Sequence, residues 1–185
     1  MAKWQLYPEA ENEDALMTAV IHHFTEMYQH YFREEFFVNH NLPIEIRGYR
    51  QSDPWHIFLL LTPWMLARLF IPIREPNIEL PSGWQAEERT TSPVTVIGPA
   101  IPLAILSGQE RAHLNYHPQL GHYLIQPLIQ AMTSFNTSDE AFQAWNEVIK
   151  KRNQVIAEQQ KQCTWQQEVS RREFFAKLRR RVSPR

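Results

Sequence analysis

Eight histidines are the side chains of this 185-residue sequence best suited to hold a metal ion or to act as a general base near neutral pH. His113 and His117 are four residues apart, a spacing that places two side chains on one face of a helix. Pro118 follows directly and disfavours a helical conformation at His117, and no cysteine lies nearby to complete a metal site. We therefore expect no metal and no cofactor. The alternative is a small metal-dependent enzyme that uses a cluster of His113, His117 and His122.

Other residue patterns that would indicate catalysis are missing from the sequence. Cys163 is the single cysteine, which excludes an internal disulfide and any multi-cysteine zinc or iron–sulfur site. A thiol without a defined base partner is weak evidence for a nucleophile, although Lys161 lies close to it in sequence. The sequence contains no Gly-x-Ser-x-Gly motif, no phosphate-binding loop and no His-Glu-x-x-His motif. These observations predict that the protein is not an enzyme.

One apolar segment, Thr62-Pro63-Trp64-Met65-Leu66, could bind a polypeptide. It follows a run of apolar residues that predicts a buried strand. Thr62 could cap a helix there, with Pro63 at the first helical position. Trp64 and Met65 would then lie at the rim of a sheet, where large and adaptable apolar side chains form peptide-binding surfaces. The alternative interpretation is that these side chains belong to the hydrophobic core.

A second segment, Ser170–Lys177, has the sequence Ser-Arg-Arg-Glu-Phe-Phe-Ala-Lys and resembles the core of a twin-arginine export signal. The residues that follow, Leu178–Arg185, are basic and cannot form the apolar stretch of a working signal. The segment is therefore either a signal-like tail or one side of an amphipathic helix. The residues of the signal-like tail are Arg171, Arg172, Phe174 and Phe175.

Hydrophobic spacing indicates which elements position these segments. Apolar residues recur at intervals of three and four between Leu16 and Tyr31 and predict a helix over 12–31. Alternating residues from Ile44 predict a half-buried strand, and Trp55–Leu61 predicts a fully buried central strand. Further short strands are expected at 94–97, 102–106 and 122–128. The middle of the chain thus predicts a short-stranded, mostly antiparallel sheet.

The last part of the chain predicts helices with a strongly basic character. A capping-box pattern at Thr137–Glu140 begins one helix, and a weaker pattern at Thr164 begins another that runs to about Arg180. Residues 150–185 carry eleven bases and three acids, although the net charge of the whole chain is −1. We predict an α+β fold with an N-terminal helix and C-terminal helices packed on the sheet, one domain over 1–150 and a basic helical extension over 151–185.

Charge and hydropathy limit the classes of partner. A net charge of −1 excludes a uniformly basic nucleic-acid binder, and an adaptor that binds nucleic acid through its basic tail is kept as an alternative. The start of the chain lacks the pattern of a secretory signal. The apolar stretch Ile57–Ile73 is shorter than a membrane span and contains two prolines and an arginine, so we expect no stable membrane insertion.

Four segments together resemble one known protein family. A buried strand runs into Thr-Pro-Trp-Met-Leu and on to an apolar stretch ending in proline, over Phe58–Pro72. Leu80–Gly83 is similar to a Leu-Pro-x-Gly turn, Tyr123–Ile149 to a strand followed by a capped helix, and Arg171–Phe174 to an Arg-Arg-x-apolar closing segment. This combination, over roughly residues 12–149 and the tail, resembles the nickel–iron hydrogenase assembly chaperones of the HybE/HoxT/HupJ type. The rubredoxin-like cysteine pairs of some relatives are missing here, so no iron binding is implied.

The resemblance implies a cytoplasmic, non-catalytic chaperone for hydrogenase maturation. Its expected partner is a hydrogenase structural subunit, most of all the small subunit or its twin-arginine signal region, bound before export or assembly. The resemblance implies no nucleic-acid partner and no cofactor. It also makes Thr62, Pro63, Trp64, Met65 and Leu66 the predicted client-binding residues.

Overall fold

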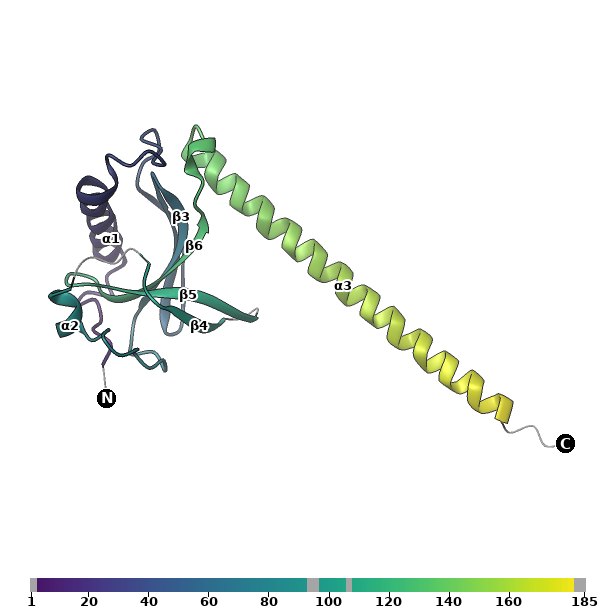
Figure 1. Ribbon diagram of the computed structural model, residues 1–185. Helices are drawn as coiled ribbons and strands as arrows, with labels where there is room; N and C mark the ends of the chain where they lie inside the picture. Colours follow the sequence, from purple (N-terminus) through teal and green to yellow (C-terminus); the bar gives the residue numbers. More distant parts are fainter. Residues whose placement is uncertain (1–2, 93–96, 106–107, 182–185) are drawn as a thin grey trace. The chain divides into compact units, whose positions relative to one another are not determined.

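The computed structural model describes the backbone of residues 3–92, 97–105 and 108–181, and the side chains of these residues except 104–109 and 160–181 (Figure 1). The helical elements are α1 (Glu13–Met27), the π-helical turn η1 (Tyr28–Phe32), α2 (Ala86–Thr90), the 3-10 turn η2 (Met132–Ser134) and α3 (Ser138–Arg181). The strands are β1 (Glu45–Ser52), β2 (Trp55–Thr62), β3 (Met65–Pro72), β4 (Ala100–Ile105), β5 (Gly108–His117) and β6 (Gly121–Ile129). The predicted α+β class is confirmed.

Helix α1 begins at the position that its sequence indicates. The side chain of Asn12 accepts a hydrogen bond from the backbone N–H of Ala15, and two acids in the first turn suit the positive end of the helix dipole. Its buried stripe consists of Leu16, Val20, His23, Phe24 and Met27. The helix predicted over 12–31 is confirmed, and its last turn widens into η1.

The six strands form one antiparallel sheet in the order β1-β2-β3-β6-β5-β4. The apolar strands β2 and β3 lie inside the sheet and pair without interruption from Trp55 with Pro72 to Thr62 with Met65. Burial on both faces explains why neither strand alternates with polar residues. The stretch Ile57–Ile73 is therefore a β-hairpin, of which the sequence predicted the first strand. Pro127 lies where the pairing of β3 with β6 shifts register, a position that tolerates a missing N–H donor.

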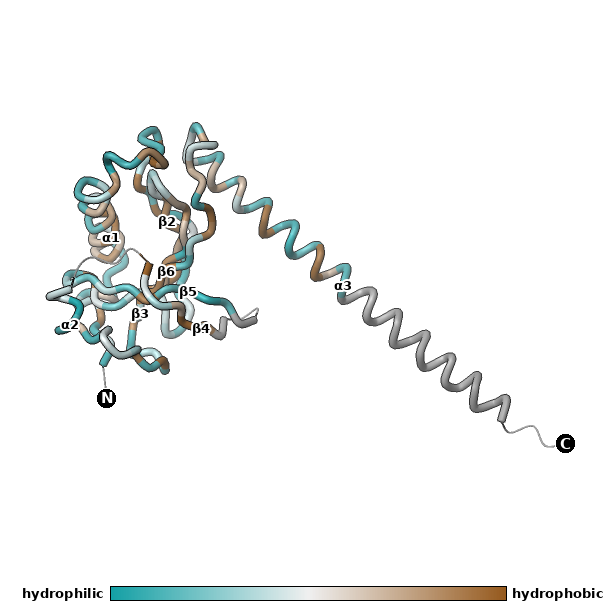
Figure 2. The backbone as a smooth tube through the Cα atoms, in the orientation of Figure 1, coloured by the Kyte–Doolittle hydropathy of each residue, from teal (hydrophilic) through white to brown (hydrophobic). Residues whose placement is uncertain are grey.

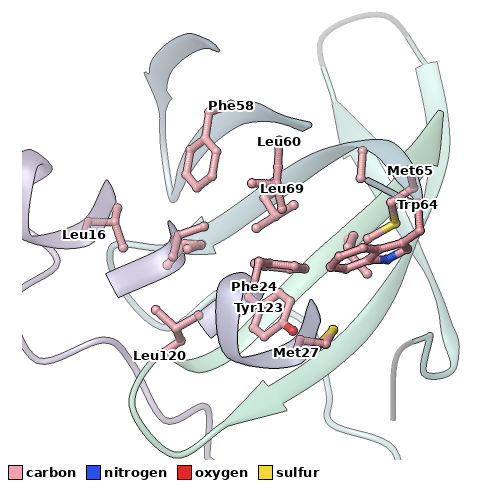
Figure 3. Close-up of a cluster of buried hydrophobic side chains, with 14 of the residues drawn as sticks. Leu16, Phe24, Met27, Phe58, Leu60, Trp64, Met65, Leu69, Leu120 and Tyr123 are labelled. Atoms are coloured by element: carbon pink, nitrogen blue, oxygen red, sulfur yellow. The ribbon is translucent and has the colours of Figure 1, made fainter. Parts of the chain in front are cut away.

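Each face of the sheet carries its own core. On one face α1 packs over alternate residues of β2, β3 and β6, around the buried side chains of Phe24, Phe58 and Tyr123 (Figures 1 and 3). The opposite face is covered by the N-terminal segment and by the loop that follows β3. There the indole N–H of Trp4 donates to the carbonyl of Ile78 at 2.8 Å, which fastens the two covering segments to each other.

Several elements differ from the prediction. Strand β5 and helix α2 were not predicted. In β5 the four-residue spacing of His113 and His117 was considered only as a helical pattern. The strand expected at 94–97 lies outside the described residues except for Ile97, which is not in a strand. The two C-terminal helices are one helix, because the backbone of α3 continues through Thr164 without a break.

The chain divides into two compact units, Met1–Ala141 and Phe142–Arg185. Helix α3 continues through residue 150, and the domain boundary expected there stays a prediction. The described part of α3 alternates between hydrophilic and hydrophobic residues (Figure 2). Within the part of the chain that the structure describes, no helix has both the length and the apolarity that crossing a membrane requires.

Candidate functional site

The segment Thr62–Leu66 contains the turn of the β2–β3 hairpin. The strands stay paired up to Thr62 and Met65, so only Pro63 and Trp64 lie in the turn. The Thr62 hydroxyl accepts hydrogen bonds from the backbone N–H groups of Trp64 and Met65, at 3.4 and 3.0 Å, and donates to the Met65 carbonyl at 3.0 Å. The helix start predicted at Thr62 and Pro63 is therefore wrong. The hydroxyl closes a turn because the flanking strands continue their antiparallel register.

All five residues of Thr62–Leu66 are buried. Trp64 is 5% exposed and Met65 is 2% exposed, although both lie at the end of a hairpin, where the sequence analysis expected an open rim. The structure therefore favours the core interpretation for this segment as it stands. Its role in client binding stays a prediction.

Aromatic rings from the end of α1 and from η1 cover Trp64. Phe32 stacks on the indole with ring centroids 4.3 Å apart and 6° between the planes. Tyr28 is also parallel to the indole at 6.3 Å, and Phe24 lies at 6.4 Å. Figure 3 shows the Trp64 side chain beside Phe24 at the border of the core cluster. Trp64 is thus buried by a helix end and not by the sheet alone.

The π-helical turn sets the position of these rings. The backbone N–H of Arg33 bonds to the Tyr28 carbonyl at 2.9 Å, five residues back, which widens the turn and brings both Tyr28 and Phe32 over Trp64. Single π-helical turns are rare and often occur at functional sites. Beyond the turn the chain is anchored by Asn39, whose N–H donates to the Pro63 carbonyl at 2.8 Å. The Asn39 side-chain amide donates to the carbonyls of Met132 and Phe135.

The aromatic contacts continue outward to the surface. Phe37 makes an edge contact with Phe32 at 6.2 Å, and Phe36 makes one with Phe37 at 5.5 Å. Exposure rises from 5% at Trp64 to 38% at Phe37 and 93% at Phe36. We call Trp64, Phe32, Phe37 and Phe36 the aromatic ladder.

The outer end of the aromatic ladder is acidic. Glu34 and Glu35 are both exposed and directly precede Phe36. Phe36 and Phe37 together form an exposed apolar surface bordered by charged residues, a combination found at sites of interaction. Sequence analysis missed these residues. The available signal was two adjacent phenylalanines that follow two glutamates beyond the apolar stripe of the helix.

One polar atom of the aromatic ladder has no hydrogen-bond partner among the described residues. The indole Nε1 of Trp64 is buried and unpaired. A buried tryptophan N–H normally finds an acceptor, and leaving it unpaired costs about 1–3 kcal/mol. When Trp64 is covered by these rings, its indole N–H therefore lacks a hydrogen-bond acceptor among the described residues.

The three histidines of the alternative enzyme hypothesis do not meet at one site. His122 pairs directly with Tyr116 across β5 and β6, so it lies on the opposite face of the sheet from His117. His122 bonds to the backbone of Gln5 and of Trp84, both at 2.8 Å, and His113 bonds to the Gly98 carbonyl at 2.8 Å. Among the described residues no group of three or more His, Cys, Asp or Glu side chains could hold a metal ion. The structure does not support this alternative.

A different histidine pair occurs under α1. His23 is buried, its Nε2 atom lies 3.1 Å from the Tyr123 hydroxyl, and its ring contacts that of His117 with centroids 4.0 Å apart and a tilt of 36°. Burial, with smaller contributions from the neighbouring imidazoles of His117 and His22, lowers the pKa of His23 to about 3. Burial also lowers the pKa of His117 and raises the pKa of Tyr123. Both imidazoles are therefore neutral near pH 7, with His23 buried and His117 half-buried beside it.

The signal-like tail lies in α3. The backbone of residues 170–177 is helical, and the side chains of Arg171, Arg172, Phe174 and Phe175 are outside the described residues. The role of this tail stays a prediction.

The chain is matched to the solution structure of HybE from Escherichia coli with a TM-score of 0.43 and 16% sequence identity, over 71% of this chain and 68% of that chain. No curated protein sequence gives a significant match. Residues 15–177 match the family model described as "[NiFe]-hydrogenase assembly, chaperone, HybE". This match spans most of the sequence, and it confirms the resemblance that the segments Phe58–Pro72 and Tyr123–Ile149 indicated. The chain belongs to the HybE family of [NiFe]-hydrogenase assembly chaperones.

Proposed function

We propose that this protein holds the small subunit of a [NiFe]-hydrogenase, together with its twin-arginine signal region, before the subunit is exported or assembled. The observation that carries the proposal is the family match over residues 15–177, which makes the protein a hydrogenase assembly chaperone. The choice of the small subunit rests on the chemistry of the surface. An export signal with paired arginines next to apolar residues is a basic and apolar segment.

The described surface suits such a segment. The unit Met1–Ala141 carries sixteen acids and eight bases, so an arginine-rich segment is attracted to it at long range. The exposed rings of Phe36 and Phe37 offer apolar contact beside the carboxylates of Glu34 and Glu35. Aromatic residues, phenylalanine among them, are enriched at protein interfaces.

This role requires binding and release of a subunit and no making or breaking of covalent bonds, and we assign the protein no catalytic activity. A chaperone that binds a subunit before export acts in the cytoplasm, where the subunit is synthesised. The single cysteine agrees with a reducing compartment.

Binding of purified hydrogenase precursors tests the proposal. The protein is immobilised, and association is measured for the small subunit with its signal, the small subunit without its signal, and the large subunit. We expect binding of the small subunit, weakened at least tenfold when the signal is removed. Equal binding of both small-subunit forms would place recognition in the mature part. Preference for the large subunit would overturn the assignment of the partner.

A further inference from the structure

The cover over Trp64 is held less firmly than the core beneath it. Phe32 belongs to η1, which contains no buried residue, and it is only partly buried itself. The segment is otherwise held near its ends, by Met27 and Val38 in the core, by the 2.7 Å contact of the Tyr28 hydroxyl with His40 Nδ1, and by Asn39 on the Pro63 carbonyl. A segment with few buried contacts between two anchors opens at a lower free energy than the strands and helices that flank it.

The covered side chain lacks a partner that a ligand could supply. Trp64 is 95% buried, and its indole N–H has no acceptor among the described residues. Phe32 covers one face of the indole, whereas the N–H points outward in the plane of the ring, so two different groups of a ligand would meet the face and the N–H. A polypeptide segment offers an apolar side chain for the stacking position and backbone carbonyls for the N–H.

Charge narrows the kind of segment that fits. On the solvent side of Phe32 the rings of Phe37 and Phe36 follow one another, and the exposed Glu34 and Glu35 directly precede Phe36 in the sequence. The five residues Arg33–Phe37 contain two acids and one base, so this exposed segment carries a net negative charge. A segment with arginines or lysines next to an apolar side chain complements both features.

We infer that Phe32 is a displaceable cover over Trp64, and that an apolar side chain of a basic segment in the bound hydrogenase subunit takes its place. The rings of Phe36 and Phe37 hold the incoming segment, and a backbone carbonyl of that segment accepts the Trp64 N–H. The identity of the subunit rests on the proposed function, whereas the displacement of Phe32 does not. The covered state keeps Trp64 out of water when no subunit is bound.

A short peptide of matching chemistry tests the displacement directly. The probe is Ac-Gly-Arg-Arg-Gly-Phe-Phe-Gly-Lys-NH2, and its control has serine in place of both phenylalanines. The indole N–H signals of the full-length protein are recorded by NMR, and the Trp64→Phe variant identifies the Trp64 signal. We expect that signal alone among the buried indoles to move downfield with the probe and to stay in place with the control. A Trp64 signal that does not move at a saturating probe concentration overturns the inference.

The affinity of the Phe32→Ala variant separates a displaceable cover from a structural contact. A cover competes with the ligand, so its removal raises the fraction of binding-competent protein and tightens probe binding, by about threefold or more. A purely structural contact predicts equal or weaker binding, and that result overturns the inference. Trp64→Phe keeps the stacked ring and loses the N–H, and it should weaken binding by about fivefold. If Phe32→Ala fails to fold, the indole signal of the wild-type protein decides.

Two further outcomes complete the test. Sedimentation shows whether a second copy of the chain occupies the surface: a dimer that Phe36→Ala dissociates would overturn the inference in favour of self-association. The hydrogenase precursors separate the inference from the proposed function. Probe binding with the Trp64 shift, but no binding of the small subunit, would refute the function and support the displacement. Small-subunit binding that is insensitive to Phe32→Ala and Trp64→Phe would refute the displacement and support the function.

Discussion

The imidazole rings of His23 and His117 lie with their centroids 4.0 Å apart and their planes tilted by 36°, and the Nδ1 atom of His117 is buried without a hydrogen-bond partner among the described residues. Such a pair is stable only while both rings are neutral, because a proton on either ring would place a charge in a largely apolar site. The pair joins α1 to the end of β5. The packing of α1 on the sheet is therefore coupled to pH.

Acid should destabilise the protein through these groups. The pKa of His23 falls from 6.5 in the unfolded chain to about 3 in the folded protein, and the pKa values of His117 and His122 also fall. Between pH 6.5 and about pH 3 the unfolded chain binds more protons than the folded protein. The free energy of unfolding therefore decreases as the pH drops below about 6.5. The contribution of His23 is fully present above pH 6.5. Urea unfolding at several pH values between 7.5 and 4.5 measures the slope.

Substitution of His23 should remove its part of this slope. His23→Gln keeps a polar partner for the Tyr123 hydroxyl and does not titrate, so the slope should fall by about 1.4 kcal/mol per pH unit below pH 6.5, the value for one proton. His30→Gln is the matched control, because His30 is exposed on η1. An equal slope in His23→Gln and the wild-type protein would contradict the burial of a neutral His23.

The Thr62 hydroxyl should matter more than its methyl group. Thr62→Val has the same shape but leaves the N–H groups of Trp64 and Met65 without their acceptor in a buried turn. We expect a loss of about 1–3 kcal/mol in the free energy of unfolding. Thr62→Ser retains the oxygen and should cost less. Chemical denaturation of both variants measures the difference, and a Val variant as stable as the Ser variant would show that the hydroxyl does not hold the turn.

Two glycines offer a matched test of how the N-terminal segment is held. Gly121 and Gly83 both have positive φ, of 73° and 81°, so alanine is strained at either position by about 1–2 kcal/mol. A Cβ at Gly121 would also lie 2.2 Å from the Gln5 carbonyl oxygen, whereas one at Gly83 would meet nothing within 4 Å. Gly121→Ala should therefore destabilise the protein clearly more than Gly83→Ala in urea unfolding. Equal losses would mean that the contact of Gln5 with the β5–β6 turn is not retained in solution.

The parts of the fold that depend on local pattern were predictable. The apolar stripe and the Asn12 cap specify α1, and the unbroken apolar run of β2 indicates a strand buried on both faces. Strand β5 also carries a local signal, because Ala112, Leu114 and Tyr116 alternate with polar residues. The four-residue spacing of His113 and His117 was interpreted as a helical pattern. The same spacing also places two side chains on one face of a strand.

The candidate site was predictable only in part, because it depends on contacts between distant segments. The Thr62–Leu66 segment was found from its composition and its place after a strand. Its burial could not be found in this way, because the cover comes from Phe32, thirty-two residues earlier than Trp64 in the sequence. Local pattern also gives no reason for the π-helical turn that positions Phe32. The pairing of Asn39 with Pro63 is equally long-range.

Charge at the entry to the aromatic ladder should affect the rate of association. Glu34→Gln combined with Glu35→Gln should slow association with the small-subunit precursor and reduce its dependence on salt, because exposed charges steer encounter at low ionic strength. Glu9→Gln combined with Glu11→Gln removes the same charge from exposed positions in the N-terminal segment and serves as the control. The measurement is the association rate at about 0.05 M and 0.5 M salt, between which the Debye length shortens severalfold. The idea fails if both double variants slow association equally.

The outer rings of the aromatic ladder should contribute to binding without contributing to folding. Phe36 is 93% exposed and contacts only Phe37 among the described rings, so Phe36→Ala should change the free energy of unfolding by no more than about 0.5 kcal/mol. If the ring is an anchor for the client, the same change should weaken binding of the small-subunit precursor by about 2 kcal/mol, or roughly thirtyfold.

Ile97→Ala is the control for this variant, because Ile97 is also an exposed large apolar residue, at 42%. It should leave both stability and binding unchanged. Unfolding in urea and equilibrium binding of the precursor together separate the two roles. A Phe36→Ala variant that binds as well as Ile97→Ala would exclude the aromatic ladder from the client interface. Binding would then have to be sought elsewhere on the unit Met1–Ala141 or on α3. A variant that loses stability instead would place Phe36 in the fold, against its exposure.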